Sequence, residues 1–198
     1  EICACLVGSE MCIRDRHNSI LVRYSNDFSI WDLESVNHYK DQSDIFFTCH
    51  EFSYNKIAEA YEPYLGLIRQ MFHRYCSGTL EEFMEECDVY KLQRPVFESY
   101  FEKGFCERTE QILIDEVEYE QERMRNSIVT MLQKLSEIRP VVIVLNRFQL
   151  ASKSTMQLSN SLLQVKNKNI GIVLGVNDVQ SIPEFAHEEW DAICESMD

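Results

Sequence analysis

Residues 139–164, RPVVIVLNRFQLASKSTMQLSNSLLQ, and residues 169–178, NIGIVLGVND, decide the fold of this chain. Each stretch contains a run of β-branched and aliphatic residues, 141–145 in the first and 170–176 in the second. Such a run is typical of a strand that is buried on both faces of a parallel sheet. Between the two runs, a segment that opens with serine and threonine predicts a helix over residues 154–165. A strand, a helix and a strand with short links form a βαβ unit with a right-handed crossover, so we expect an α/β fold.

Upstream of this unit, the sequence predicts two more strands. The apolar runs at residues 19–24 and 44–49 are each followed by polar turn residues, as buried strands are, and residues 28–40 are weakly helical. A helix is expected over residues 57–75, because apolar residues recur there at steps of three and four. Pro63 lies inside this segment and predicts a kink or a break.

The middle of the chain predicts three more helices. Thr79 followed by Glu82 has the spacing of a capping box at the start of a short helix. Pro95 suits the first turn of a second helix, which we expect Gly104 to end. The longest helical signal covers residues 109–138. The expected fold is therefore a partly parallel sheet with flanking helices and a helical insertion.

The first sixteen residues, EICACLVGSEMCIRDR, resemble translated sequencing-adapter sequence and continue into no periodic element. Their apolar run is interrupted by glycine, serine and glutamate and has no basic residue ahead of it, which argues against a signal peptide. We therefore assign residues 1–16 to an artefact. Residues 17–198 are expected to form one domain, a fragment of a longer protein, because the chain stops at Asp198 without a capping signal.

The cysteines indicate a reducing compartment. Of the eight cysteines, three lie in residues 1–16, and the remaining five are odd in number and contain no C-x-x-C pair. This pattern argues against a disulfide framework and against a zinc ribbon. No stretch approaches the roughly 20 apolar residues that span a bilayer. We therefore expect a cytoplasmic protein without membrane insertion.

The charge excludes one large class of partner. The chain carries a formal net charge of −14, and the first sixteen residues hold three acids and two bases, so residues 17–198 carry −13. A chain this acidic repels phosphate backbones, and no basic stripe interrupts it. Nucleic acid is therefore not expected as a partner.

The segment that decides the fold also carries a resemblance to a family. It is similar to the Walker B strand, turn and helix of STAND-type AAA+ ATPases, whose pattern is four apolar residues, two acids, an aromatic residue, then Ser/Thr and paired leucines. Residues 46–72, FFTCHEFSYNKIAEAYEPYLGLIRQMF, resemble the second strand of that family and the helix with its Pro-Tyr motif. The resemblance implies a P-loop NTPase-like fold. More narrowly, the chain resembles the ATPase-like region of large bacterial signalling proteins, which precedes tetratricopeptide repeats and an output domain such as a diguanylate cyclase.

The residues that such an ATPase needs are missing. An active member has the loop G-x-x-x-x-G-K-[ST], whose backbone amides and lysine hold the phosphates, and this motif occurs nowhere in the chain. If residues 20–24 are the first strand, the loop should start at Ser25, where SNDFSIWDLES has no glycine and no lysine. Asn146 and Arg147 stand where the Walker B acids should hold Mg²⁺ and orient the attacking water. Asn177 matches the polar sensor position, although it also suits a simple turn.

These features predict a non-catalytic, ATPase-like regulatory or scaffold domain of bacterial signal transduction. Asn146, Arg147 and Asn177 are its vestigial nucleotide-site residues, and we expect no catalytic residue, no metal site and no cofactor. The expected partners are downstream domains of the same chain or another copy of the protein. The alternative is a nucleotide-binding STAND-type switch that uses ATP and whose Walker A loop lies upstream of His17, outside this fragment. A weaker alternative is a thiol-dependent enzyme with Cys49 as its nucleophile.

Overall fold

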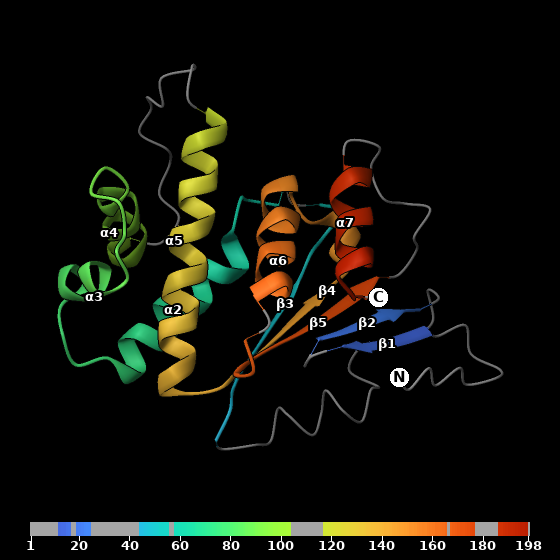
Figure 1. Cartoon of the computed structure of the whole chain (residues 1–198), viewed down its shortest axis with the longest axis horizontal. Helices are drawn as coiled ribbons and strands as arrows, with labels where there is room; N and C mark the ends of the chain where they lie inside the picture. Colours follow the sequence, from blue (N-terminus) through green and yellow to red (C-terminus); the bar gives the residue numbers. More distant parts are fainter. Residues whose placement is uncertain are drawn as a thin grey trace. The chain divides into compact units, whose positions relative to one another are not determined.

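The computed structural model describes residues 12–16, 19–24, 44–55, 58–103, 117–165, 167–176 and 186–197, without the side chains of 12–16, 102–103 and 117–118. The chain divides into two compact units (Figure 1). The sheet unit combines Glu1–Glu62 with Arg139–Asp198, and the helical unit is Pro63–Ile138. The expected helical insertion is thus present, because the helical unit interrupts the sequence of the sheet unit.

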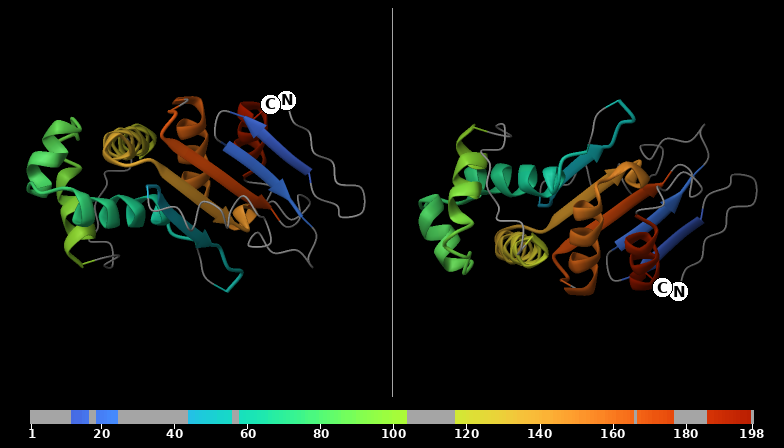
Figure 2. Two further views of the ribbon diagram at one scale, coloured as in Figure 1. Left: turned by 90° about the horizontal axis from the view of Figure 1, so that it is seen from below. Right: turned by 90° about the horizontal axis from the view of Figure 1, so that it is seen from above.

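The sheet has five strands in the order β1-β2-β5-β4-β3, which can be followed in Figure 2. Their bounds are Cys12–Arg16 for β1, Ser19–Arg23 for β2, Phe46–Glu51 for β3, Val141–Asn146 for β4 and Ile170–Val176 for β5. Four strands, β2 to β5, are mutually parallel where they pair. All six residues of β4 are buried, as its continuous aliphatic run predicts. The α/β class and the βαβ unit are confirmed.

Strand β1 lies in the adapter-like segment, for which we predicted no structure. Cys12–Arg16 pairs antiparallel with β2, from Cys12 opposite Arg23 to Arg16 opposite Ser19. The edge of β2 presents a row of backbone N–H and C=O groups, and a neighbouring strand satisfies them whatever its side-chain pattern. A short edge strand therefore needs no hydrophobic periodicity, which is the signal that the sequence lacks here.

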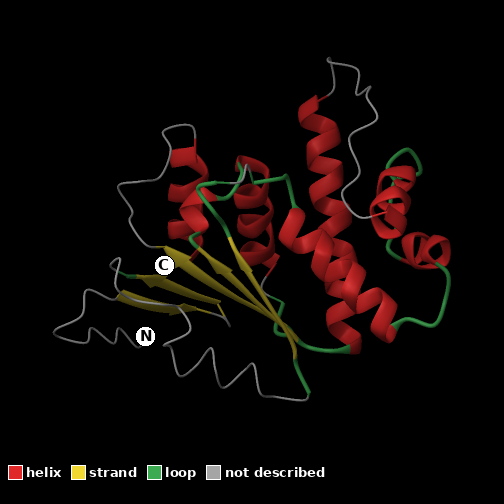
Figure 3. Ribbon diagram, turned by 180° about the vertical axis from the view of Figure 1, so that it is seen from behind, coloured by secondary structure: helices red, strands yellow, loops and turns green. Residues whose placement is uncertain are grey.

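Two helices of the sheet unit, α6 (Lys153–Val165) and α7 (His187–Met197), lie side by side on one face of the sheet (Figures 1 and 3). Arg23 of β2 points to this face, since its Nη2 donates to Cys194 Sγ at 3.6 Å and its guanidinium lies 6.0 Å from the Trp190 ring. Alternate strand residues point to the opposite face. That opposite face carries a buried cluster formed by Val22, Tyr24, Val142, Val144 and Val173.

A buried carboxylate connects α6 to α7. Glu189 is 8 % exposed, and its Oε1 accepts hydrogen bonds from Lys153 Nζ and Gln157 Nε2, both at 3.0 Å. Burial alone would raise the pKa of Glu189, but the hydrogen bonds from Lys153 and Gln157 outweigh it, so the pKa lies below its ordinary value. The ionised carboxylate is therefore favoured in the folded state.

This lowered pKa predicts a pH-dependent contribution to stability. A carboxyl group with a depressed pKa stabilises the fold above its unfolded value of about 4.3, and this stabilisation is lost as the pH falls through the folded pKa. At pH 7 we expect Glu189→Gln to lower the free energy of unfolding by about 1–2 kcal/mol. Urea denaturation at several pH values should show this difference shrinking below about pH 4. Glu188→Gln, at the exposed neighbouring position, is the control, and an equal effect there would contradict the assignment.

The helical unit consists of α2 (Glu62–Tyr75), α3 (Leu80–Glu86), α4 (Arg94–Lys103) and α5 (Val117–Ile138) (Figure 1). Helix α2 begins at Glu62 and not at residue 57, so Pro63 lies in the first turn instead of kinking a longer helix. A proline fits there because the first turn has no intrahelical use for its N–H group. Tyr61, with a left-handed φ of 62°, directs the chain into the helix.

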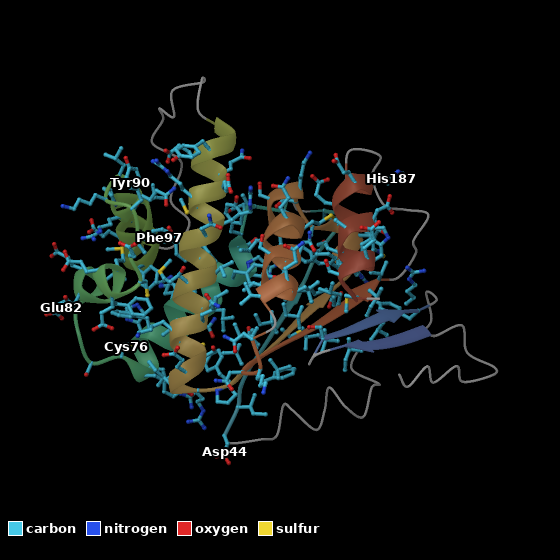
Figure 4. All side chains as sticks on the ribbon, viewed as in Figure 1. Asp44, Cys76, Glu82, Tyr90, Phe97 and His187 are labelled. Carbon is cyan, nitrogen blue, oxygen red and sulfur yellow. The ribbon has the colours of Figure 1, made fainter. Side chains whose placement is uncertain are left out.

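The other helix predictions of this unit hold where the structure describes them. Thr79 and Glu82 form the capping box, with Glu82 N donating to Thr79 Oγ1 at 3.2 Å and Thr79 N donating to Glu82 Oε2 at 2.9 Å (Glu82 is labelled in Figure 4). Pro95 lies in the first turn of α4. Residues 28–40, Gly104 and the expected first turns of α5, residues 109–116, lie outside the described residues. Within the described ranges, no helix combines the length and apolar character that crossing a bilayer requires.

Candidate functional site

The carboxyl ends of the four parallel strands meet at one edge of the sheet. Ligands of open α/β sheets bind in the crevice outside this edge, so it is the first place to look for a site. Glu51 is the last residue of β3 and Asn146 is the last residue of β4, and the register pairs these two residues directly. Tyr24 follows β2 immediately, and its backbone N–H donates to the carbonyl of Val176, the last residue of β5, at 3.0 Å.

Asn146 is held by two hydrogen bonds at this edge. Its Oδ1 accepts from the Tyr24 hydroxyl and, at 3.0 Å, from the backbone N–H of Arg147. Tyr24 and Asn146 are 5 % and 6 % exposed, so water does not compete with these bonds. The amide oxygen at this position is therefore already bound by the protein itself.

The hydrogen bond between Tyr24 and Asn146 reaches across strand β5, which lies between the strands of these two residues. Strand β5 lies between β2 and β4, and the register places its Gly175 opposite Val22 on one side. Continuing the β4–β5 register by one residue places the same glycine opposite Asn146. Gly175 has no side chain, so β5 presents no group between the tyrosine ring and the asparagine at this level.

Arg147 extends the network to β3. It has a left-handed backbone conformation, φ 55° and ψ 44°, which turns the chain sharply out of β4 into the 3₁₀ turn η3, Phe148–Leu150. Its Nε lies 3.4 Å from Glu51 Oε1, and the two side chains are 39 % and 48 % exposed. An ion pair with this exposure contributes little to stability. It does neutralise the carboxylate of Glu51, which is the only carboxylate among the four residues of this network, Tyr24, Glu51, Asn146 and Arg147.

Tyr24 acts as a donor in this network. Burial raises the pKa of the Tyr24 hydroxyl above its ordinary value, against the lowering effect of hydrogen bonds to Arg147 and Asn146 and of the Arg147 charge. The hydroxyl therefore keeps its proton at neutral pH. With its proton in place, the hydroxyl donates to the amide oxygen of Asn146.

Tyr24, Glu51, Asn146 and Arg147 do not provide the ligands that Mg²⁺ prefers. Mg²⁺ is held in proteins by carboxylate oxygens and water, but the oxygen of Asn146 is uncharged and has two donors directed at it, and Glu51 is paired with Arg147. Within the described residues, no three His, Cys, Asp or Glu side chains are grouped in a way that would hold a metal ion.

The structure brings Asn146 and Arg147 together, as their adjacency in the sequence requires. Asn177 and the expected phosphate-loop position, from Ser25 onward, lie outside the described residues, so those expectations stay predictions. The sequence reasoning missed Tyr24 and Glu51 as site residues. Both were detectable in one respect, because Tyr24 ends the strand predicted at residues 19–24 and Glu51 lies just after the strand predicted at residues 44–49.

Phe148 fixes this turn in the core. Its side chain is fully buried, and its ring centroid lies 6.3 Å from that of Phe52 and 6.4 Å from that of Trp190. Phe52 follows β3, and its backbone N–H donates to the carbonyl of Asn146 at 3.1 Å. Phe148 is therefore a packing residue that joins the turn after β4 to the end of β3 and to α7.

Cys49 and His50 do not form a nucleophile and base pair. Cys49 is half-buried against the cluster of Val144 and its neighbours on the face opposite α6 and α7. The His50 ring packs edge-on against Phe52 at 4.6 Å. Neighbouring strand residues point to opposite faces, so the thiol and the imidazole diverge. Among the described cysteines, no pair forms a disulfide.

Comparisons with family models, curated proteins and solved structures found no match to this chain.

Proposed function

We propose that this chain is a non-catalytic, ATPase-like domain that acts as a regulatory or scaffold domain in bacterial signal transduction. One observation carries the proposal: the amide oxygen of Asn146, at the position that the family resemblance gives to the Walker B acid, accepts hydrogen bonds from Tyr24 and Arg147. A site whose metal-facing oxygen is already bound, and which offers no uncompensated carboxylate among these residues, is suited to structure and not to phosphoryl transfer.

The proposal places the domain in the cytoplasm, where signalling domains of this type work. Its partners are neighbouring domains of the same polypeptide or a second copy of the protein. The strand order supports the family resemblance, because β4, the Walker B-like strand, lies between the parallel strands β5 and β3 inside the sheet. A position between two parallel strands places the end of β4 at the crevice where α/β proteins bind ligands.

The test measures ATP turnover and ATP binding together. With Mg²⁺ and ATP, the unmodified chain is expected to release no more phosphate than the control variants Asn146→Ala and Arg147→Ala. Addition of ATP should not change the thermal midpoint of the unmodified chain. A ligand bound at a hundred times its Kd stabilises a protein by about 2.7 kcal/mol, so thermal denaturation would detect binding without hydrolysis. Turnover that Asn146→Ala abolishes would overturn the proposal. A nucleotide-dependent rise in the midpoint that the same variant abolishes would favour the nucleotide switch.

A further inference from the structure

A group of exposed apolar side chains lies on the helical unit. We call it the tyrosine patch: Tyr90 and Leu92 in the turn before α4, Val96 in α4, and Tyr119 in α5, with Tyr90 labelled in Figure 4. Their exposed fractions are 40 %, 73 %, 54 % and 54 %. These four are the majority of the seven large hydrophobic side chains that are exposed in the described part of the chain. Tyr90, Leu92 and Val96 follow one another closely in the sequence, and Arg123 joins Tyr90 to Tyr119. Scattered exposed apolar residues are ordinary, whereas a concentration of them indicates an interaction surface.

Arg123 holds the two tyrosines of the patch side by side. Its guanidinium carbon lies 4.1 Å from the ring centroid of Tyr90 and 4.0 Å from that of Tyr119. Arg123 Nη2 also donates to the Tyr119 hydroxyl at 2.8 Å, and Nη1 donates to Glu120 at 3.3 Å. One guanidinium therefore contacts both rings, which restrains them before any partner arrives. Pre-ordered tyrosine and arginine side chains are the residues that carry most binding energy at interfaces.

The turn beneath the patch is also fixed. Gln93 is 4 % exposed, and it joins the turn to α5 by donating from Nε2 to the Glu120 carbonyl at 3.2 Å and accepting from Ser127 Oγ at 3.1 Å. Arg94 Nε donates to the Val89 carbonyl at 3.2 Å. The exposed side chains therefore stand on a rigid base, which lowers the entropy that binding would cost.

The charges around the patch select the partner. In the segments that carry it, residues 85–98 and 119–123, acids outnumber bases by six to three. Two of the three bases are already engaged, Arg94 with Glu85 at 3.1 Å and Arg123 with Glu120 at 3.3 Å. The surroundings of the patch are therefore acidic, and they repel nucleic acid, an anionic membrane and the same acidic patch of another copy.

We propose that the tyrosine patch docks a protein partner through an amphipathic segment whose apolar face is flanked by lysine or arginine. The apolar face covers Leu92, Val96 and the tyrosine rings, and the basic residues complement the acids around them. The patch belongs to the helical unit, whereas Asn146 belongs to the sheet unit. Partner binding at the tyrosine patch and the absence of ATP turnover at Asn146 are therefore tested independently, and either proposal can fail without the other.

The experiment uses a synthetic amphipathic helix of about 18 residues, five turns, with leucines along one face and lysines on both sides of it. Its binding to the full chain is followed by fluorescence anisotropy at physiological salt. We expect the variant Leu92→Ser/Val96→Ser to weaken binding by roughly tenfold or more. The matched control is Ile138→Ser/Val165→Ser, which removes two exposed aliphatic side chains elsewhere and keeps the same net charge. This control should bind as the unmodified chain does, and circular dichroism verifies that both variants fold.

Each other outcome overturns the proposal. Equal binding by both variants would mean that the peptide follows the general negative charge of the chain. A peptide with glutamate in place of lysine that binds equally well would remove the role of the acidic surroundings. A concentration-dependent dimer in sedimentation that Leu92→Ser/Val96→Ser dissolves would identify a second copy of this chain as the occupant.

Discussion

Replacing Phe148 by alanine is expected to lower the free energy of unfolding by about 3–5 kcal/mol, the range for truncating a large buried aromatic side chain. Phe148 is fully buried, and its ring contacts Phe52 and Trp190, so the truncated side chain would leave a cavity between the β4 turn, the end of β3 and α7. Urea denaturation followed by circular dichroism measures the change. A loss this large is comparable to the whole stability of a marginal domain.

Two variants make the Phe148 result interpretable. Phe148→Leu keeps most of the volume and should cost less than about 1.5 kcal/mol. Tyr54→Ala removes an aromatic ring that is 68 % exposed and should change stability by no more than about 0.5 kcal/mol. If Phe148→Ala were as mild as Tyr54→Ala, the turn after β4 would not be anchored by this ring.

Replacing Asn146 by alanine is the second large effect that we expect. The truncation removes the amide oxygen that accepts from two donors, the Tyr24 hydroxyl and the Arg147 backbone N–H, in a site that is nearly closed to water. An unsatisfied buried polar group costs about 1–3 kcal/mol, so Asn146→Ala should lower the free energy of unfolding by about 2–4 kcal/mol. Urea denaturation at pH 7 gives this value.

Tyr24→Phe separates the parts of this network. It removes one donor and leaves Asn146 Oδ1 bonded to Arg147 N, so we expect a loss of only about 1 kcal/mol. The double variant should lose less than the sum of the two single losses, because both remove the same hydrogen bond. A Tyr24→Phe loss equal to or greater than that of Asn146→Ala, or strict additivity, would contradict the shared bond.

Composition and periodicity predicted most of the sheet. Val141–Asn146 and Ile170–Val176 form the strands that their β-branched runs indicate, and the strand expected at residues 44–49 is shifted by two residues, to Phe46–Glu51. The start of α2 was placed too early, because the apolar spacing continues through residues 57–61 although the chain turns at Tyr61 before entering the helix. A periodic pattern predicts a helical face, and it does not fix where the helix begins.

The candidate site was only partly predictable. Asn146 and Arg147 follow directly from the end of a recognisable strand. The contact between Tyr24 and Asn146 could not be predicted in this way. It depends on the strand order, which places β5 between their strands, and on the position of Gly175, which leaves space for the tyrosine ring to reach across β5. The ion pair of Arg147 with Glu51 depends in the same way on β3 lying beside β4. Sequence periodicity identifies strands but does not order them.

The division of the sheet unit by the helical unit has a consequence for folding kinetics. Strands β3 and β4 pair along their full length although Pro63–Ile138 separates them in the sequence. Each doubling of a closing loop costs only about 0.6 kcal/mol of entropy, so the insertion weakens the folded state little. It lengthens the search for that pairing, since contacts distant in sequence form slowly. We therefore expect the local β4-α6-β5 unit to form first, and β3 to pair with β4 only after the long loop has closed.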